Sequence, residues 1–166
     1  MASSKPYYVM DGYDFVAYPN RNSVTFREFY GIPEAHTVMR GSLRYDGNPM
    51  FVQALADLGW LDGEQKEWLH DGMTWAETFQ KAISASDSKE ETLIAKVKDI
   101  CKFSTLAESD RIISGLRWFG LFSSEEDAPV VGGNLLDTLC GRLEKLLSYQ
   151  PGERDLVMLQ HKFVIE

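Results

Sequence analysis

The sequence predicts an α+β fold in which the two chain ends form a small mixed β-sheet, with an all-α subdomain inserted between the strands and no Rossmann domain. Strand-like segments lie in the first 45 residues and after Pro151, whereas residues 48–149 show helical periodicity and repeated helix start signals. The length of 166 residues is that of about one domain. We therefore divide the chain into sheet residues 1–46, a helical insert at 47–150 and a return strand at 151–166.

Two strands are expected near the N-terminus. Residues 7–18 are rich in aromatic residues and valine, and the turn formers of residues 19–23 follow them. Residues 37–45 alternate in polarity, which places Met39, Gly41, Leu43 and Tyr45 on one face and Val38, Arg40, Ser42 and Arg44 on the other.

Helix start signals recur through the middle of the chain. Asn48 and Pro49 begin a helix that should stop at Gly59. Patterns typical of capping boxes begin at Asp62, Thr74, Ser88 and Thr105. Asn134 should cap the last helix, whose leucines between residues 135 and 147 recur at helical spacing and indicate a core helix.

A third strand is expected at the C-terminus. Residues 156–159 form a short apolar run, and alternation follows as far as Ile165. The sequence stops at Glu166 within this pattern, so we expect the rest of that sheet to lie outside the 166 residues. The segments 9–18, 38–45 and 156–165 should pair with one another.

Composition excludes several classes of function. Lys and Arg number 17 against 25 Asp and Glu, and the net charge of −8 disfavours a surface for nucleic acid or a basic face for membranes. No run of about 18 apolar residues and no signal peptide are present. The two isolated cysteines, Cys101 and Cys140, suit a reducing compartment, so we expect a soluble cytoplasmic protein.

Motifs for catalysis or cofactor binding are absent from the sequence. No GxGxxG follows a strand, and the glycine loop at residues 130–134 lacks the lysine and hydroxyl of a phosphate loop. The three histidines lie in different contexts without HExxH. We therefore assign no catalytic, cofactor-binding or metal-binding residue in this chain.

The arginine-bearing strand is the exception. Arg40, Ser42 and Arg44 share one face, and Arg21 could approach that face from the turn after the preceding strand. Two or three guanidinium groups beside a hydroxyl suit a small molecule with several carboxylates. Internal ion pairs with the chain's own Asp and Glu residues, or plain exposure to solvent, are the alternatives.

A family resemblance becomes specific at these residues. The chain resembles the fungal saccharopine reductases, the NADP-dependent saccharopine dehydrogenases that form L-glutamate in lysine biosynthesis. The segments that carry the resemblance are, in order, residues 15–21, 32–35, 40–45, 135–140 and 152–163.

The resemblance implies a dimeric, three-part oxidoreductase with a Rossmann domain for NADP, a substrate-binding and dimerisation domain, and a helical domain inserted into the second. This sequence resembles a fragment made of part of the second domain and the helical insert. The substrate contacts that the family implies here are Arg21, Ser42, Leu43 and Arg44, with Ser42 in place of the usual threonine.

The reaction implied by the resemblance condenses α-aminoadipate semialdehyde with glutamate and reduces the imine with NADPH to saccharopine. We expect NADP to bind the full-length enzyme but not this chain, and the isolated chain to be inactive. Two competing hypotheses are an independent helical interaction or scaffold module and a small free-standing carboxylate-binding protein.

Overall fold

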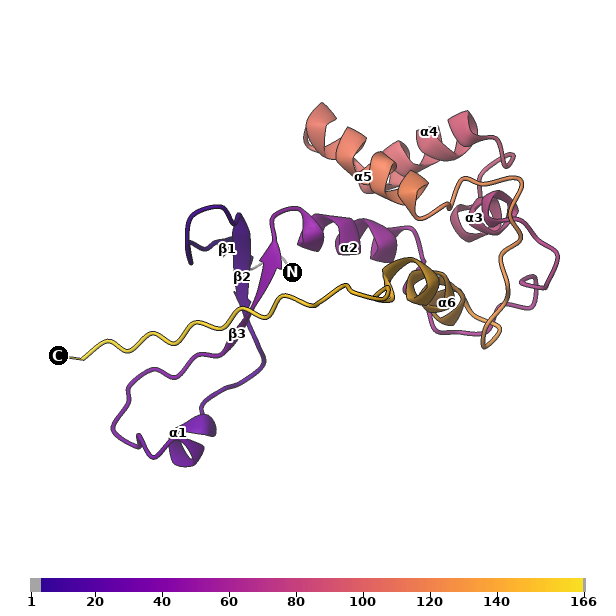
Figure 1. Cartoon of the computed structure of the whole chain (residues 1–166). Coiled ribbons are helices and arrows are strands. Elements are labelled where there is room, and N and C mark those ends of the chain that lie inside the picture. Colours follow the sequence, from indigo (N-terminus) through magenta and orange to yellow (C-terminus); the bar gives the residue numbers. More distant parts are fainter. Residues whose placement is uncertain (1–3, 166) are drawn as a thin grey trace. The chain divides into compact units, whose positions relative to one another are not determined.

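The computed structural model describes residues 4–165, and the chain divides into two compact units. The first, here called the sheet unit, takes in the residues up to Met50 and the segment from Val157 onward. The second, the helical unit, is Phe51–Leu156. The boundary between the units falls inside helix α2 (Figure 1).

The sheet unit holds a three-stranded antiparallel sheet. Its strands are β1 (Lys5–Pro6), β2 (Phe15–Pro19) and β3 (Gly41–Tyr45), in the order β1-β2-β3. Strands therefore form in both N-terminal segments predicted to contain them, although they are shorter than predicted. A short helix that the sequence analysis did not predict, α1 (Phe26–Phe29), lies in the connection from β2 to β3.

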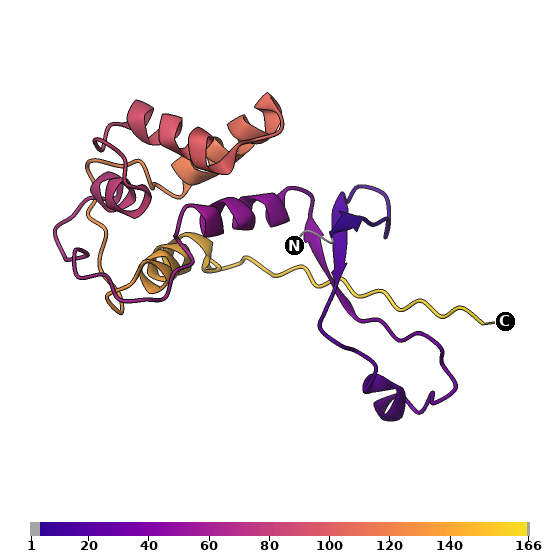
Figure 2. The ribbon, with the colours of Figure 1, turned by 180° about the vertical axis from the view of Figure 1, so that it is seen from behind.

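The predicted C-terminal strand does not form. Residues 153–165 contain neither helix nor strand, as both views of the ribbon show (Figures 1 and 2). The sheet is consequently antiparallel, not mixed, and only the N-terminal part of the chain builds it. Alternating apolar residues favour an extended backbone, but a strand also requires a partner's backbone groups. Six apolar side chains of this segment are 60 to 90% exposed: those of Leu156, Val157, Leu159, Phe163, Val164 and Ile165.

Five helices follow β3, and the helical reading of residues 48–149 is confirmed. They are α2 (Asn48–Asp57), α3 (Trp75–Ile83), α4 (Glu90–Cys101), α5 (Leu106–Trp118) and α6 (Leu135–Leu147). The side chains of Thr74, Thr105 and Asn134 cap α3, α5 and α6 as predicted. Residues 48–149, all of which the structure describes, form no strand beyond the single bridge between Thr74 and Asp127.

One predicted helix start, at Asp62, and one predicted helix cap, at Ser88, are wrong. No helix begins at Asp62, whose carboxylate accepts a hydrogen bond from the Glu64 N–H at 2.8 Å. Helix α4 begins at Glu90 without a side-chain cap, and Asp87 accepts from the Lys89 N–H at 2.9 Å. Asp side chains bind the backbone two residues ahead in local turns, and this competes with helix capping.

The core lies in the helical unit and contains large aromatic residues. Trp60, Trp75 and Phe79 are almost fully buried, with the Trp60 and Phe79 ring centroids 5.6 Å apart. Helices α4, α5 and α6 contribute aliphatic side chains to the same cluster: those of Leu93, Val97, Ile112, Leu116, Leu135 and Leu139. Leu139 is 1% exposed, in agreement with the prediction of a core helix.

Candidate carboxylate-binding site

The turn after β2 is tied by hydrogen bonds to the start of β3. The Asn20 N–H donates to the Arg40 carbonyl at 2.8 Å, which extends the β2–β3 ladder by one rung. The hydroxyl of Ser23, which is buried, accepts from the Arg40 N–H and donates to the Arg21 carbonyl, each at 3.2 Å. Asn20 and Ser23 are thus both anchored to Arg40, and they fix the backbone from which the Arg21 side chain projects.

Gly41 allows the close approach of the two strands at this point. A Cβ atom at Gly41 would lie 2.9 Å from the Tyr18 carbonyl oxygen, a distance that real Cβ atoms essentially never show. Because the obstacle is backbone, it cannot move aside as a side chain could. The glycine between Arg40 and Ser42 is thus required by packing.

The register of the strands sorts the predicted site residues onto two faces. Ser42 lies opposite Tyr18 and Arg44 opposite Val16, so Ser42 and Arg44 share one face. Leu43 lies opposite Ala17, and its side chain is on the other face.

Leu43 nevertheless reaches the edge of the sheet through its backbone. Backbone hydrogen bonds link Asn20 to Arg40 and Asp14 to Asp46. They show that the even-numbered residues between 40 and 46 direct their backbone groups toward β2. In an antiparallel pair the intervening residues direct N–H and C=O to the other side, so those of Leu43 point to the outer edge of β3. The Leu43 carbonyl accepts from Arg44 Nη1 at 2.7 Å, which tethers that guanidinium beside the edge.

Arg40 has a different partner. Its guanidinium lies 4.0 Å from the centre of the Phe26 ring of α1, in a cation–π contact. The charge of Arg40 thus rests against α1, and we do not count it among the groups that face a ligand.

The guanidinium groups of this segment lack carboxylate partners within the described part of the chain. Arg117 and Arg142 of the helical unit form ion pairs with Glu90 and Glu126 at 2.6 and 2.8 Å. Among residues 4–165, no carboxylate lies within 4.0 Å of Arg21, Arg40 or Arg44. Internal ion pairing, one alternative to a ligand site, is therefore not observed among the described residues. Arg21 and Arg44 are exposed to solvent, which was the other alternative.

The glycine loop before α6 is unsuited to phosphate. Asn134 Nδ2 donates to Asp137 Oδ2 at 2.8 Å, and the Asp137 N–H donates back to Asn134 Oδ1 at 2.8 Å. A carboxylate thus already occupies the helix N-terminus that an anion would need. Residues 4–165 contain no cluster of three potential metal ligands. Within the same residues, no helix combines the length and apolar character needed to cross a membrane.

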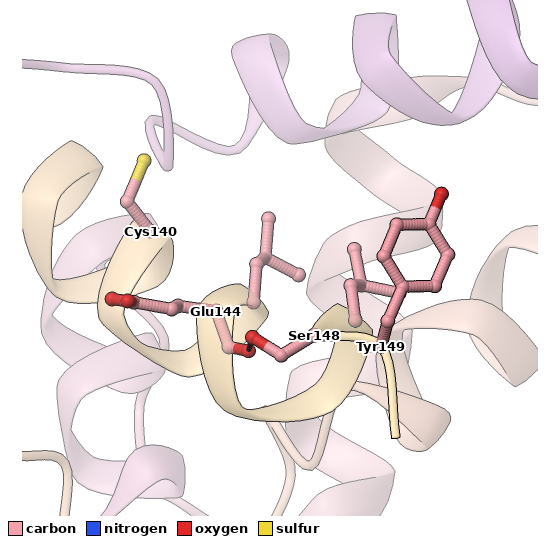
Figure 3. A pocket seen from close by; sticks show the side chains of 6 residues that line it. Cys140, Glu144, Ser148 and Tyr149 are labelled. Carbon is pink, nitrogen blue, oxygen red and sulfur yellow. Dashed lines mark hydrogen bonds between the residues drawn. The ribbon is translucent and has the colours of Figure 1, made fainter. Parts of the chain in front are cut away.

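An open groove lies on α6. Its lining residues are Cys140, Leu143, Glu144, Leu147, Ser148 and Tyr149 (Figure 3). It contains a carboxylate but no arginine, lysine or histidine, so its chemistry does not suit an anionic ligand.

Three residues that organise the site were not predicted from the sequence: Asn20, Ser23 and Phe26. Asn20 and Ser23 were interpreted only as turn formers, although Asn and Ser in a turn often bond to nearby backbone. The contact of Phe26 with Arg40 depends on α1, whose start pattern, Thr25 followed by Glu28 three residues later, was overlooked in the sequence.

The structure is that of an α+β protein in which two exposed arginines, Arg21 and Arg44, lie at the sheet without a carboxylate partner among residues 4–165. The family model described as "Saccharopine dehydrogenase C-terminal domain" matches residues 1–166. The chain belongs to this family, which confirms the resemblance found in its sequence.

Curated relatives agree with this assignment. The chain is 45% identical over 166 residues to "Saccharopine dehydrogenase [NADP(+), L-glutamate-forming]" of Pyricularia oryzae, with 100% of this chain and 36% of the relative covered. The protein of the same name from Saccharomyces cerevisiae is 46% identical, with 100% and 37% covered. "Alpha-aminoadipic semialdehyde synthase, mitochondrial" of Bos taurus is 31% identical over 157 residues, with 93% and 16% covered.

A solved structure is also similar. It is described as "Apo histidine-tagged saccharopine dehydrogenase (L-Glu forming) from Saccharomyces cerevisiae", with a TM-score of 0.84 and 43% identity over 90% of this chain and 33% of that one. The chain thus spans little more than a third of the length of the fungal relatives that it matches.

Proposed function

We propose that this chain forms part of an NADP-dependent saccharopine dehydrogenase that produces saccharopine from α-aminoadipate semialdehyde and L-glutamate. Within that enzyme the chain binds and orients the substrate through Arg21, Ser42, Leu43 and Arg44. The names of the fungal relatives, which specify NADP(+) and L-glutamate, support the reaction.

The observation that carries the site is the absence of carboxylate partners for Arg21 and Arg44 among residues 4–165. A planar guanidinium binds a carboxylate through two parallel hydrogen bonds, and saccharopine carries three carboxylates. The Leu43 N–H, directed to the edge of β3, adds a backbone donor beside Arg44. We assign these groups to substrate positioning and none of them to proton transfer.

The described residues do not fit NADP. The glycine loop at residues 130–134 precedes α6, and the Asp137 carboxylate in the first turn of α6 lies where a phosphate would bind. We therefore expect the NADP site to lie outside this chain. The 166-residue chain alone should not oxidise NADPH when supplied with the semialdehyde and glutamate. Measurable turnover would contradict this assignment.

We further propose that residues 1–46 and 151–166 belong to the substrate-binding and dimerisation domain and that residues 47–150 are a helical insert. The compact unit Phe51–Leu156, which interrupts the sheet unit along the chain, supports this division. The intact enzyme is expected to be a cytoplasmic homodimer without nucleic-acid or membrane partners.

The test of the substrate site is replacement of Arg21 or Arg44 by Lys in the full-length protein. Lysine keeps the charge but loses the two-pronged geometry, so the KM for saccharopine should rise about tenfold or more while the fold survives. Arg111→Lys, at an exposed position of α5 in the helical unit, is the matched control. Unchanged kinetics in both Arg21→Lys and Arg44→Lys would overturn the proposal.

A further inference from the structure

We propose that Asn20 is a positioning residue that holds the Ser42 hydroxyl as a hydrogen-bond acceptor for an amino group of the substrate. This inference rests on the proposed function, because it assumes that Ser42 faces the substrate. It divides the site by chemistry: the arginines bind the carboxylates, and Ser42 binds an amine.

The geometry begins with a side-chain hydrogen bond across the two strands. Ser42 Oγ lies 3.0 Å from Asn20 Oδ1, to which it donates its proton. Asn20 is itself fixed, because its backbone N–H donates to the Arg40 carbonyl at 2.8 Å. Ser42 is half-buried and Asn20 is exposed, so this bond lies at the surface, where a ligand can reach the hydroxyl.

The donor and acceptor capacities of the two groups determine what Ser42 can still do. An amide oxygen only accepts, and a serine hydroxyl has a single proton and two lone pairs. With its proton committed to Asn20, Ser42 Oγ offers the ligand only lone pairs. A carboxylate, which has no proton to give, cannot bind such an oxygen, whereas an ammonium N–H can.

The neighbouring groups have the opposite capacity. Arg44 shares the face of Ser42, and its guanidinium only donates. An amino acid carries its ammonium and its α-carboxylate on the same carbon atom. On one face of the sheet, the Ser42 hydroxyl can therefore accept from the ammonium while the Arg44 guanidinium donates to the carboxylate. L-glutamate and α-aminoadipate semialdehyde, from which saccharopine forms, both have this arrangement.

The experiment compares ligands that differ only in the amino group. L-glutamate and glutarate form one pair, and L-α-aminoadipate and adipate form the other. Each is measured as a competitive inhibitor against saccharopine with the full-length protein. Ser42→Ala and Asn20→Ala should each weaken binding of the amino ligand in at least one pair by about threefold to tenfold. Binding of the matching diacid should not change.

The double variant tests whether the two residues act as a unit. Asn20→Ala combined with Ser42→Ala should cost no more than Ser42→Ala alone, because Asn20 acts through the hydroxyl. Ser42→Thr retains the hydroxyl and should keep the selectivity for the amino ligand. Asn22→Ala is the matched control, since Asn22 lies in the same turn and its side chain accepts only from the Val24 N–H.

Asn20→Asp keeps the acceptor and separates positioning from damage to the turn. Its added charge should weaken the diacid, which carries two negative charges, more than the amino ligand, so the selectivity for the amino ligand should be retained or increased. Equal losses of both ligands in Ser42→Ala and Asn20→Ala would overturn the inference. If the Lys variants of Arg21 and Arg44 bind all four ligands normally, the proposed function itself fails.

Discussion

Gly41 is the single residue on which the approach of β3 to β2 depends most directly. Alanine there would place its Cβ 2.9 Å from the Tyr18 carbonyl oxygen, so the strands would have to separate. We expect Gly41→Ala to lower the free energy of unfolding by about 1–3 kcal/mol, as overpacking usually does. Urea unfolding measures this loss.

Gly63→Ala is the control for this substitution, because its Cβ would meet only Leu136 at the ordinary distance of 3.8 Å. Equal stability of the two variants would show that the strands yield at Gly41 without cost.

Cys101 illustrates how surroundings determine the reactivity of a residue. Burial, followed by the negative charges of Asp57 and Glu108, raises the pKa of the Cys101 thiol to about 11. The thiolate is the reactive form, so only about 0.1% of Cys101 is nucleophilic at pH 8. Alkylation by iodoacetamide should therefore be slow and should accelerate about tenfold per pH unit up to pH 10.

Mass spectrometry of the labelled peptides measures this rate, and urea, which exposes the thiol, should abolish the protection. Rapid labelling of native Cys101 at pH 8 would contradict the prediction.

The helices differ in how their first turns are capped. The Thr105 hydroxyl accepts from the Glu108 N–H at 3.1 Å at the start of α5, whereas α4 begins without a side-chain cap. Thr105→Ala should consequently cost about 0.5–2 kcal/mol of stability. Ser88→Ala, at a position where the sequence pattern wrongly predicted a cap, should stay within about 0.5 kcal/mol of the original protein.

Thermal or urea unfolding of the two variants gives the comparison. A loss in Ser88→Ala as large as that in Thr105→Ala would mean that α4 has a cap of the kind predicted from the sequence.

We expect the 166-residue chain to self-associate. The Leu43 backbone points to the outer edge of β3, and six apolar side chains of residues 156–165 are at least 60% exposed. Strand edges and extended apolar segments recruit further strands, and a two-fold dimer is the commonest closed product. Light scattering after size exclusion at micromolar concentration should give a mass above the 18.8 kDa of the monomer.

Val164→Lys, which places a charge on the exposed segment, should shift this equilibrium toward monomer. Tyr149→Lys, at another exposed position, should not. A monomer at every concentration would contradict the prediction.

The parts of the fold that the sequence predicted depend on local interactions. Thr74, Thr105 and Asn134 each bond to the backbone three residues ahead, so the spacing of a few residues is sufficient to find them. Asp62 and Asp87 show where such patterns mislead. Each Asp carboxylate accepts a hydrogen bond from the backbone N–H two residues ahead, in a local turn, and does not cap a helix. The prediction of a C-terminal strand was wrong for another reason. Alternating apolar side chains favour an extended backbone, but they do not specify which strand would pair with it.

The family, the helical character of residues 48–149 and the strand that bears Ser42 and Arg44 could be predicted from the sequence alone. The three-dimensional structure was needed to find that Ser42 donates to Asn20, that Arg40 packs on Phe26 and that Arg21 and Arg44 have no carboxylate partner among residues 4–165. The physical reason is distance along the chain. Periodicity and capping act between residues a few positions apart, whereas the bond of Ser42 to Asn20 crosses a strand pair and the contact of Arg40 with Phe26 spans a long connection.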